Sequence, residues 1–271
     1  MSFRFSKFLA RCLAAFCLFT AARASAELGQ VLPMGDLERW AIFTLGDGSE
    51  TNLVGGDSFV QGDLGAAGNG NVTLSGNATV NGDVYYKSNG TLRVDRGATI
   101  TGSRFNNQNP LLRNGTDEAK AASDAAAAFA ATRTLDEVNL SGNDSLSFTG
   151  APGETVVLNL KCFKLSGNST FTLDGAANTT YIINVKNQFC LAGHANIVFT
   201  GGLDWNDVLF NVRGKGDDVL LSRDSSFQGV LMASKRTVRL RDNAIARGEI
   251  IADSIQVQSS SQVIHPPLAS P

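Results

Sequence analysis

Residues 163–173 read FKLSGNSTFTL, and this stretch decides the fold class of the chain. Apolar residues alternate with other residues on both sides of a Ser-Gly-Asn turn, which is the period of a strand with one buried face. Gly and Asn are the residues that accept the positive φ of a tight turn. The stretch therefore predicts two short strands that meet at a corner and face one core.

The same unit recurs along the chain, for example as VTLSGNATV at residues 72–80 and VNLSGNDSL at residues 138–146. Eight copies are recognised by the last apolar residue before each turn: Leu74, Val94, Leu140, Leu165, Leu191, Leu221, Leu240 and Val257. Apart from one step of 46 residues, successive copies lie 17 to 30 residues apart, which suits one coil of a solenoid. Stacked coils bury a continuous apolar column, so we predict an all-β fold, a β-solenoid.

The step of 46 residues holds a different composition. Residues 116–132 read TDEAKAASDAAAAFAAT. Alanine is the strongest helix former, Thr116 can cap a helix, and the two acidic residues that follow suit the positive end of the helix dipole. Ala122, Ala126 and Phe129 form one mildly apolar stripe. We predict one long α-helix over about 116–132, lying along the solenoid.

The N-terminus has the features of an export signal. Arg4, Lys7 and Arg11 precede an apolar run, and the small residues ASA follow at 24–26. We predict a signal peptide over residues 1–26 cleaved after Ala26, a solenoid domain over 27–265 and a short tail over 266–271. No later segment approaches the roughly 20 apolar residues of a membrane helix. The mature protein is therefore expected to be secreted, without a transmembrane segment.

Charge and residue types argue against several classes of function. The chain has 23 basic and 25 acidic residues, and the four basic residues of the signal leave a mature formal charge of −6, which disfavours nucleic acid. His194 and His265 stand far apart and give no zinc site. The acidic residues fall mainly in apparent turns and do not converge on one groove, as carbohydrate cleavage requires. We expect no enzyme activity, no cofactor and no metal.

Two cysteines, Cys162 and Cys190, remain after the signal is removed. Export permits a disulfide between them. The repeat places both on one outward face, offset by two residues, which is somewhat far for a bridge unless a bulge closes the gap. A disulfide and two free thiols are both open at this point.

The strand after each turn carries short, mostly uncharged outward residues. Ala78 and Val80 face inward, and the same register through the repeats gives a series that continues with Asn196, Val198 and Gln228 until Ile245 and Arg247 break the pattern. Asn196, Gln228 and Arg247 are expected to disturb its regularity at one end. The predicted binding face consists of Thr79, Asn81, Thr99, Thr101, Ser145, Ser147, Thr170, Thr172 and Ser226.

This series predicts a regular array of hydroxyl and methyl groups, because outward residues are about 7 Å apart along a strand and about 4.8 Å apart between strands. A rigid, flat face with little charge suits ice, which is itself uncharged and extended. Thr is favoured on exposed strands whatever the function, so an adhesive face or a purely structural coat fits the same pattern. Adhesion would instead depend on the neighbouring charged column, which includes Arg93, Lys164 and Arg239.

Several motifs occur in a familiar order: GDLG at 62–65, the strand repeats, the Ala-rich segment, VLFNV at 208–212 and SSFQGVLMA at 225–233. Over roughly residues 38–265, the chain resembles the ice-binding-like (DUF3494-type) domain family and the related choice-of-anchor A surface domains. The resemblance implies a right-handed parallel β-helix of roughly triangular section, with a helix packed alongside and coils not stacked strictly in sequence order.

The resemblance also implies a class of partner. Members of these families include secreted ice binders and surface or adhesive proteins with varied C-terminal anchors. Residues 266–271 show no sorting motif and no apolar helix. We therefore expect a released, monomeric protein whose partner is an ice surface or an extracellular polysaccharide or matrix.

Overall fold

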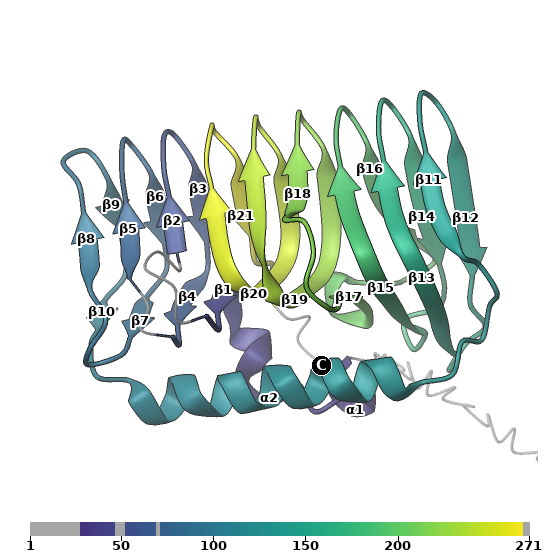
Figure 1. The fold of residues 1–271 in the computed structure, drawn as a ribbon, viewed down its shortest axis with the longest axis horizontal. Helices are drawn as coiled ribbons and strands as arrows, with labels where there is room; N and C mark the ends of the chain where they lie inside the picture. The colour runs from purple at the N-terminus through teal and green to yellow at the C-terminus, as the bar shows by residue number, and fades with distance from the viewer. Residues whose placement is uncertain (1–27, 47–51, 69–70, 268–271) are drawn as a thin grey trace, which may run out of the picture.

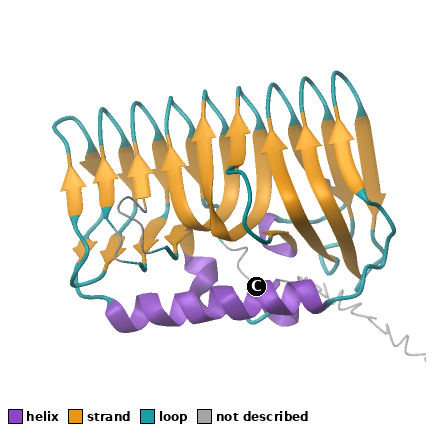
Figure 2. Ribbon diagram, viewed as in Figure 1, coloured by secondary structure: helices purple, strands orange, loops and turns teal. Residues whose placement is uncertain are grey.

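The computed structural model describes residues 28–46, 52–68 and 71–267. They form parallel strands wound into coils with three faces, and one long helix lies alongside (Figures 1 and 2). The prediction of an all-β, parallel β-helix with a helix packed alongside is confirmed. The predicted signal peptide and the last four residues of the predicted tail lie outside the described residues.

Each coil passes over the three faces in the same order. Face 1 contains β2 (Asn52–Val54), β5 (Val72–Leu74), β8 (Leu92–Val94), β11 (Glu137–Leu140) and β18 (Val219–Ser222). Face 2 contains β3 (Phe59–Gln61), β6 (Thr79–Asn81), β9 (Thr99–Ile100), β12 (Ser145–Thr149), β14 (Thr170–Asp174), β16 (Asn196–Thr200) and β21 (Gln262–Ile264). Face 3 contains β1 (Trp40–Thr44), β4 (Asp63–Ala66), β7 (Val84–Tyr86), β10 (Arg104–Phe105) and β17 (Val208–Val212).

Four long strands turn the corners between faces. β13 (Thr155–Leu165) and β15 (Thr180–Leu191) run from face 3 into face 1. β19 (Ser226–Arg241) and β20 (Ile245–Val257) start on face 2, cross face 3 and end on face 1. These strands tie the faces together in the half of the molecule that contains the C-terminal repeats.

The coils are not stacked in sequence order, as the family resemblance implies. Along face 1 the order is β8-β5-β2-β20-β19-β18-β15-β13-β11. The chain begins with β1 in the middle, builds outward to β10 at one end, crosses to the other end, and builds back (Figure 1). β20 and β21 then pair with β1, β2 and β3, so the two halves meet in the middle.

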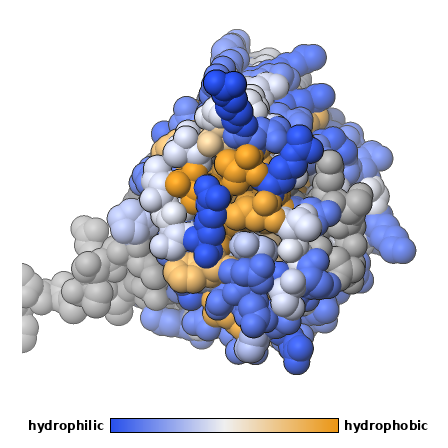
Figure 3. Space-filling model, turned by 90° about the vertical axis from the view of Figure 1, so that its left-hand side faces the viewer, coloured by the Kyte–Doolittle hydropathy of each residue, from blue (hydrophilic) through white to orange (hydrophobic). Residues whose placement is uncertain are grey.

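Aromatic rings fill the core of the coils toward the β11 end. The Phe163 and Phe189 rings stack with centroids 5.0 Å apart, and Phe210 packs edge-on against both. At the opposite end the coil of β8 to β10 is open, so Leu92 is only partly buried and Phe105 is 37% exposed. Apolar atoms are therefore visible among polar ones when the molecule is viewed from that end (Figure 3).

The long helix α2 (Asn109–Ala128) begins and ends earlier than predicted. Pro110 occupies its first turn, where a missing backbone N–H costs nothing. Thr116, the predicted cap, lies inside the helix and donates its hydroxyl to a carbonyl one turn earlier. Gly115, which follows Asn in the sequence and so has the signature of a turn, lies inside the helix and close to the ring of Phe43. A Cβ at this position would lie 2.7 Å from that ring.

Face 3 is covered by helices. The small residues Ala119, Ala122 and Ala126 of α2 are fully buried in one cluster with apolar residues of face 3. The segment before β1, which forms α1 (Leu28–Val31) and the 3-10 helix η1 (Gly35–Arg39), packs in the same cluster. A second 3-10 helix, η2 (Trp205–Asp207), leads into β17 and adds its buried indole.

A ladder of polar side chains fixes the position of α2 on face 3. Ser123 of α2 donates its hydroxyl to the Oδ1 of Asn211, 2.8 Å away. Asn211 donates to the Ser123 carbonyl and to the Oδ1 of Asn184, and Asn184 donates to the Oδ1 of Asn159 on the next coil. Burial makes these hydrogen bonds specific, because an unpaired amide there has no water to replace its partner.

The ladder predicts a large difference between its inner and outer members. Asn211→Ala is expected to lower the free energy of unfolding by about 1–3 kcal/mol, since it leaves the Ser123 hydroxyl and the Oδ1 of Asn184 buried without the partners that Asn211 supplies. Asn159→Ala, at the exposed end of the ladder, is expected to cost less than about 0.5 kcal/mol. Urea unfolding of both variants measures the difference, and equal losses would contradict this account of how α2 is docked.

One buried carboxyl group is unfavourably placed. Glu249 of β20 is fully buried, and neither of its carboxylate oxygens has a hydrogen-bond partner among the described residues. Burial raises the pKa of this group well above its ordinary value of 4.5, and the nearby carboxylate of Glu38 raises the pKa further. The folded protein therefore binds a proton at Glu249 more tightly than the unfolded chain does.

This pKa shift predicts a pH-dependent gain for Glu249→Gln. Because the folded state holds the extra proton, the contribution of Glu249 to stability is complete below pH 4.5 and is lost as the pH rises through the raised pKa. The variant should be more stable than the natural protein at pH 8, with a gain that shrinks toward pH 4.

The control is Glu154→Gln, which should show the opposite trend. Hydrogen bonds from the Ala151 N–H and the Arg133 side chain lower the pKa of the Glu154 carboxyl. The carboxylate of Glu154 then contributes stability above its ordinary pKa, and this contribution is lost on acidification. Thermal unfolding of both variants between pH 4 and pH 8 tests the pair. If the stability differences of the two variants changed with pH in the same direction, the opposite pKa shifts assigned to Glu249 and Glu154 would be contradicted.

Candidate functional site

Faces 1 and 2 remain open, and face 2 presents its outward residues in register across the coils. Ser145 pairs with Thr170, Thr170 pairs with Asn196, and Asn196 pairs with Ser226. Ser147, Thr172 and Val198 form the next row. Inward residues between these rows, such as Phe171 and Ile197, are buried in the core. The strands therefore adopt the alternation of inward and outward residues that the repeat predicts.

The predicted face residues fall into two groups. The small polar array lies on β6 and β9 at one end of face 2, and its outward residues are Thr79, Asn81, Thr99 and Thr101. The large polar array lies on β12, β14, β16 and the start of β19 toward the other end. Its outward residues are Ser145, Ser147, Thr149, Thr170, Thr172, Asp174, Asn196, Val198, Thr200, Ser226 and Gln228.

The two arrays are separated by coils from the middle of the molecule. Ile245 pairs with Ser226 on one side and with Gln262 on the other, and Gln262 pairs with Phe59. The expectation that Arg247 disturbs the face at one end was wrong. The coil of Arg247 lies between the arrays, because the C-terminal strands return to the centre and do not continue outward.

Sequence reasoning missed part of this central region. Phe59 and Gln61 of β3 and the outward residues of β21 were not recognised as members of the face. The coil of β2 and β3 does not match the repeat pattern, because Asn52 stands where the other copies have an apolar residue. For β21 the sequence does contain a signal. In the other repeats the first outward residue of face 2 follows the last apolar residue before the turn at a constant spacing, and the same spacing counted from Val257 reaches Gln262.

Face 2 carries few charges and several ordered side chains. Among its described outward positions only Asp174 and Arg247 are charged. Hydrogen bonds between neighbouring strands order the edges of the arrays: Thr101 donates to Asn81 and Thr200 donates to Asp174, each at 2.7 Å. Within the described residues the hydroxyls of Ser147 and Thr172 have no protein partner, so they are available to water.

Stacked turns hold the strands of face 2 in place. Gly167 has a φ of +70°, and a Cβ there would lie 2.8 Å from the backbone nitrogen of Gly142 in the next coil. Asn168 donates its amide to the Oδ1 of Asn143 at 3.1 Å, which joins the same two turns. The turns therefore approach closely enough to set the spacing of the coils.

Face 1 does not bring its predicted cations together. Arg93 lies on β8 near one end of the solenoid, Lys164 on β13 near the other, and Arg239 between them on β19. Arg93 is held by Asp95 at 2.8 Å and Arg239 by Asp218 at 2.5 Å. These three residues form no common site.

Cys162 and Cys190 are free thiols, so the possible disulfide is not formed. Cys162 pairs with Gln188, and Cys190 pairs with Lys164, which leaves the two cysteines offset by two residues on neighbouring strands. A shift of register occurs just before Cys162, but it does not bring the thiols opposite each other. Burial raises the pKa of the Cys190 thiol and so disfavours the thiolate, which is the reactive form.

Residues 28–46, 52–68 and 71–267 contain no group of three or more His, Cys, Asp or Glu side chains placed to hold a metal ion. Over the same ranges no helix is both long and apolar enough to cross a membrane.

Solved structures of other proteins share this architecture. A glycosylated ice-binding protein from an Arctic yeast is 19% identical, with a TM-score of 0.55 over 92% of this chain and 97% of its own. An ice-binding protein from the Antarctic ascomycete Antarctomyces psychrotrophicus is 16% identical, with a TM-score of 0.53 over 89% and 98%. The DUF3494 domain of Shewanella frigidimarina ice-binding protein 1 is 17% identical, with a TM-score of 0.50 over 90% and 98%. At such identities the likeness concerns the fold alone.

Sequence comparison with whole families is more specific. None of the curated proteins matches this chain. The family model described as a putative ice-binding-like adhesive domain matches residues 33–265, which is nearly the whole of the described structure and includes both polar arrays. The chain therefore belongs to the ice-binding-like adhesive domain family.

Proposed function

We propose that this protein is exported and binds ice through the large polar array of face 2. The observation that carries the proposal is the in-register arrangement of short side chains on four neighbouring strands, from Ser145 through Thr170 and Asn196 to Ser226. Export would use the signal predicted at residues 1–26, and cleavage after Ala26 would leave the whole solenoid intact.

Order and low charge suit the large polar array to ice. Strands of one parallel sheet repeat at about 4.8 Å, and outward residues along each strand repeat at about 7 Å, so the array is a two-dimensional lattice of hydroxyl and methyl groups. The stacked turns and buried Phe rings hold this lattice rigid before any ligand arrives. Little conformational entropy is then lost when ordered water settles on it. Asp174 is the one charged member, and it lies at the edge of the array with Thr200 bonded to it.

The family and fold support this proposal at the level of class. The solved structures with this architecture include proteins named as ice-binding, and the matching family is described as ice-binding-like and adhesive. We propose no catalytic activity, because neither polar array contains paired acid and base groups.

Adhesion is the second candidate, and one observation favours it. The coil of Ile245 and Arg247 divides face 2, so the flat array is narrower than the face itself. A large ice plane gains less from a divided face, whereas a polymer or a matrix protein can bind beside or across the division.

Ice binding predicts a specific loss when the large array is made bulky. The double variant Ser147→Tyr, Thr172→Tyr places two rings on neighbouring strands and should abolish thermal hysteresis and the inhibition of ice recrystallisation. Tyr is well tolerated on exposed strands, so the fold should survive. The measurements are made on purified protein, with circular dichroism as the check of folding.

The matched control lies on the same two coils, one face away. Asn139 and Lys164 are paired on β11 and β13 of face 1, so Asn139→Tyr, Lys164→Tyr introduces the same bulk without touching face 2. This control should keep full activity. A third variant, Thr79→Tyr, Thr99→Tyr, alters the small array and is expected to reduce activity only in part. No ice activity in the natural protein would overturn the proposal.

A further inference from the structure

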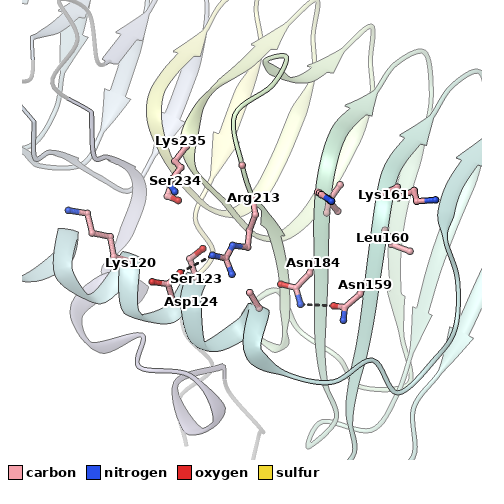
Figure 4. Close-up of a pocket in the computed structure, with 14 residues that line it drawn as sticks. Lys120, Ser123, Asp124, Asn159, Leu160, Lys161, Asn184, Arg213, Ser234 and Lys235 are labelled. Carbon is pink, nitrogen blue, oxygen red and sulfur yellow. Dashed lines mark hydrogen bonds and ion pairs between the residues drawn. The ribbon is translucent and has the colours of Figure 1, made fainter.

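A groove lies away from face 2, between α2 and the corner at which face 3 turns into face 1 (Figure 4). Its volume is about 790 Å³. Five cationic side chains line it against a single acidic one, Asp124, in a chain whose net charge is −2. The cations are Lys120, Lys161, Lys186, Arg213 and Lys235. We refer to this feature as the basic groove.

The cations of the strands form a ladder. Leu160 pairs with Val185, and Val185 pairs with Val212, so Lys161, Lys186 and Arg213 each directly follow a paired residue on three successive coils, although the register of β13 and β15 shifts by one residue just after Leu160 and Val185. Neighbouring parallel strands lie about 4.8 Å apart, so one positive charge is present on each successive coil along the solenoid axis. Lys235 extends the row on the next long strand, and Lys120 lines the groove from α2.

A buried arginine fixes the backbone of this ladder. Arg236 is 3% exposed, and its guanidinium donates to the carbonyls of Lys186, Arg213 and Gly214 at 2.9 to 3.0 Å. It also donates to the carbonyls of Asn187 and Asp217. A planar group with five donors can hold several carbonyls at once. The basic positions are therefore set by the fold before a ligand binds.

Two ladder cations already contact carboxylates. Arg213 is paired with Asp124 at 2.9 Å, and Lys161 is paired with Asp136 at 2.8 Å. The two aspartates are 75% and 71% exposed, so these are surface pairs of small net value that a stronger partner can replace. Lys120, Lys186 and Lys235 form no ion pair with any residue that the structure describes.

The rest of the lining indicates the chemistry of the ligand. Asn159, Asn184, Ser123 and Ser234 supply amides and hydroxyls, which are groups that bond to sugar hydroxyls. No aromatic ring is among the groove residues, so the stacking that single-stranded nucleic acid uses has no platform. We propose that the basic groove binds a linear acidic polysaccharide, with its carboxylates on the cation ladder and its hydroxyls toward the polar lining.

This inference deepens the adhesive alternative and is independent of ice binding. The basic groove and the large polar array share no residue, so both sites can operate in one molecule. An acidic polysaccharide bound along the solenoid axis would leave face 2 open to water.

The test measures binding of polygalacturonate, a linear polymer of carboxylated sugars, to the purified protein at an ionic strength of about 0.15 M, where charges more than about 8 Å apart are largely screened. Lys186→Ser, Lys235→Ser should weaken binding by about tenfold or more, because it removes two unpaired charges from the groove. Lys87→Ser, Lys164→Ser removes the same charge from other surfaces and should change affinity less than about twofold. Circular dichroism confirms that both variants fold.

Two further ligands test whether binding requires carboxylates and a sugar chain. Fully methyl-esterified polygalacturonate keeps the sugar chain but lacks charge and should not bind, and single-stranded DNA of similar charge should bind more weakly than polygalacturonate. Equal loss in the two lysine variants, equal binding of DNA, or no binding of polygalacturonate would each overturn the inference. Ice activity that persists in Lys186→Ser, Lys235→Ser separates this result from the outcome for face 2.

Discussion

Parallel pairing of the last strands with the first strands is the constraint on which the rest of the structure depends. β20 pairs with both β1 and β2, and β21 pairs with β3. Without these contacts the two halves of the solenoid would end in open strand edges, and β1 would lack one of its two neighbours. The pairing joins residues near 42 with residues near 250, so the loop that it closes is almost the whole chain.

This closure explains the role of the long helix. The chain reaches one end of the solenoid at β10 and must cross to the other end before it can build back toward β1. α2 makes that crossing along face 3, which its alanines bury. The amide ladder through Asn211 and Asn184 then fixes its position, since apolar packing of small residues alone specifies register weakly.

The same closure distributes the functional surfaces. Coils from the two halves meet on face 2, and their junction carries Ile245 and Arg247 between the two polar arrays. The corner beside α2 is lined by cations from strands that are consecutive neighbours on one side of the junction. The basic groove is therefore continuous, whereas face 2 is divided. Arg236, a buried charge held by backbone carbonyls, belongs to that corner, whereas Glu249 is buried without such partners and costs stability at neutral pH.

The sequence by itself determined the coil, its corners and the inward and outward sides of each strand. Alternation around Leu165 and Leu74 reports burial directly, and a turn such as that at Gly167 needs residues that tolerate positive φ, so local chemistry is enough. The sequence also located the helix but not its start. The close approach of Gly115 to Phe43 is a tertiary contact, which the local sequence does not reveal. Only the tertiary structure decided which coils are neighbours. Every parallel coil has the same hydrogen-bonding edge, so nothing local to Arg247 could show that it lies at the centre of face 2, or that Lys186 and Arg213 form one ladder.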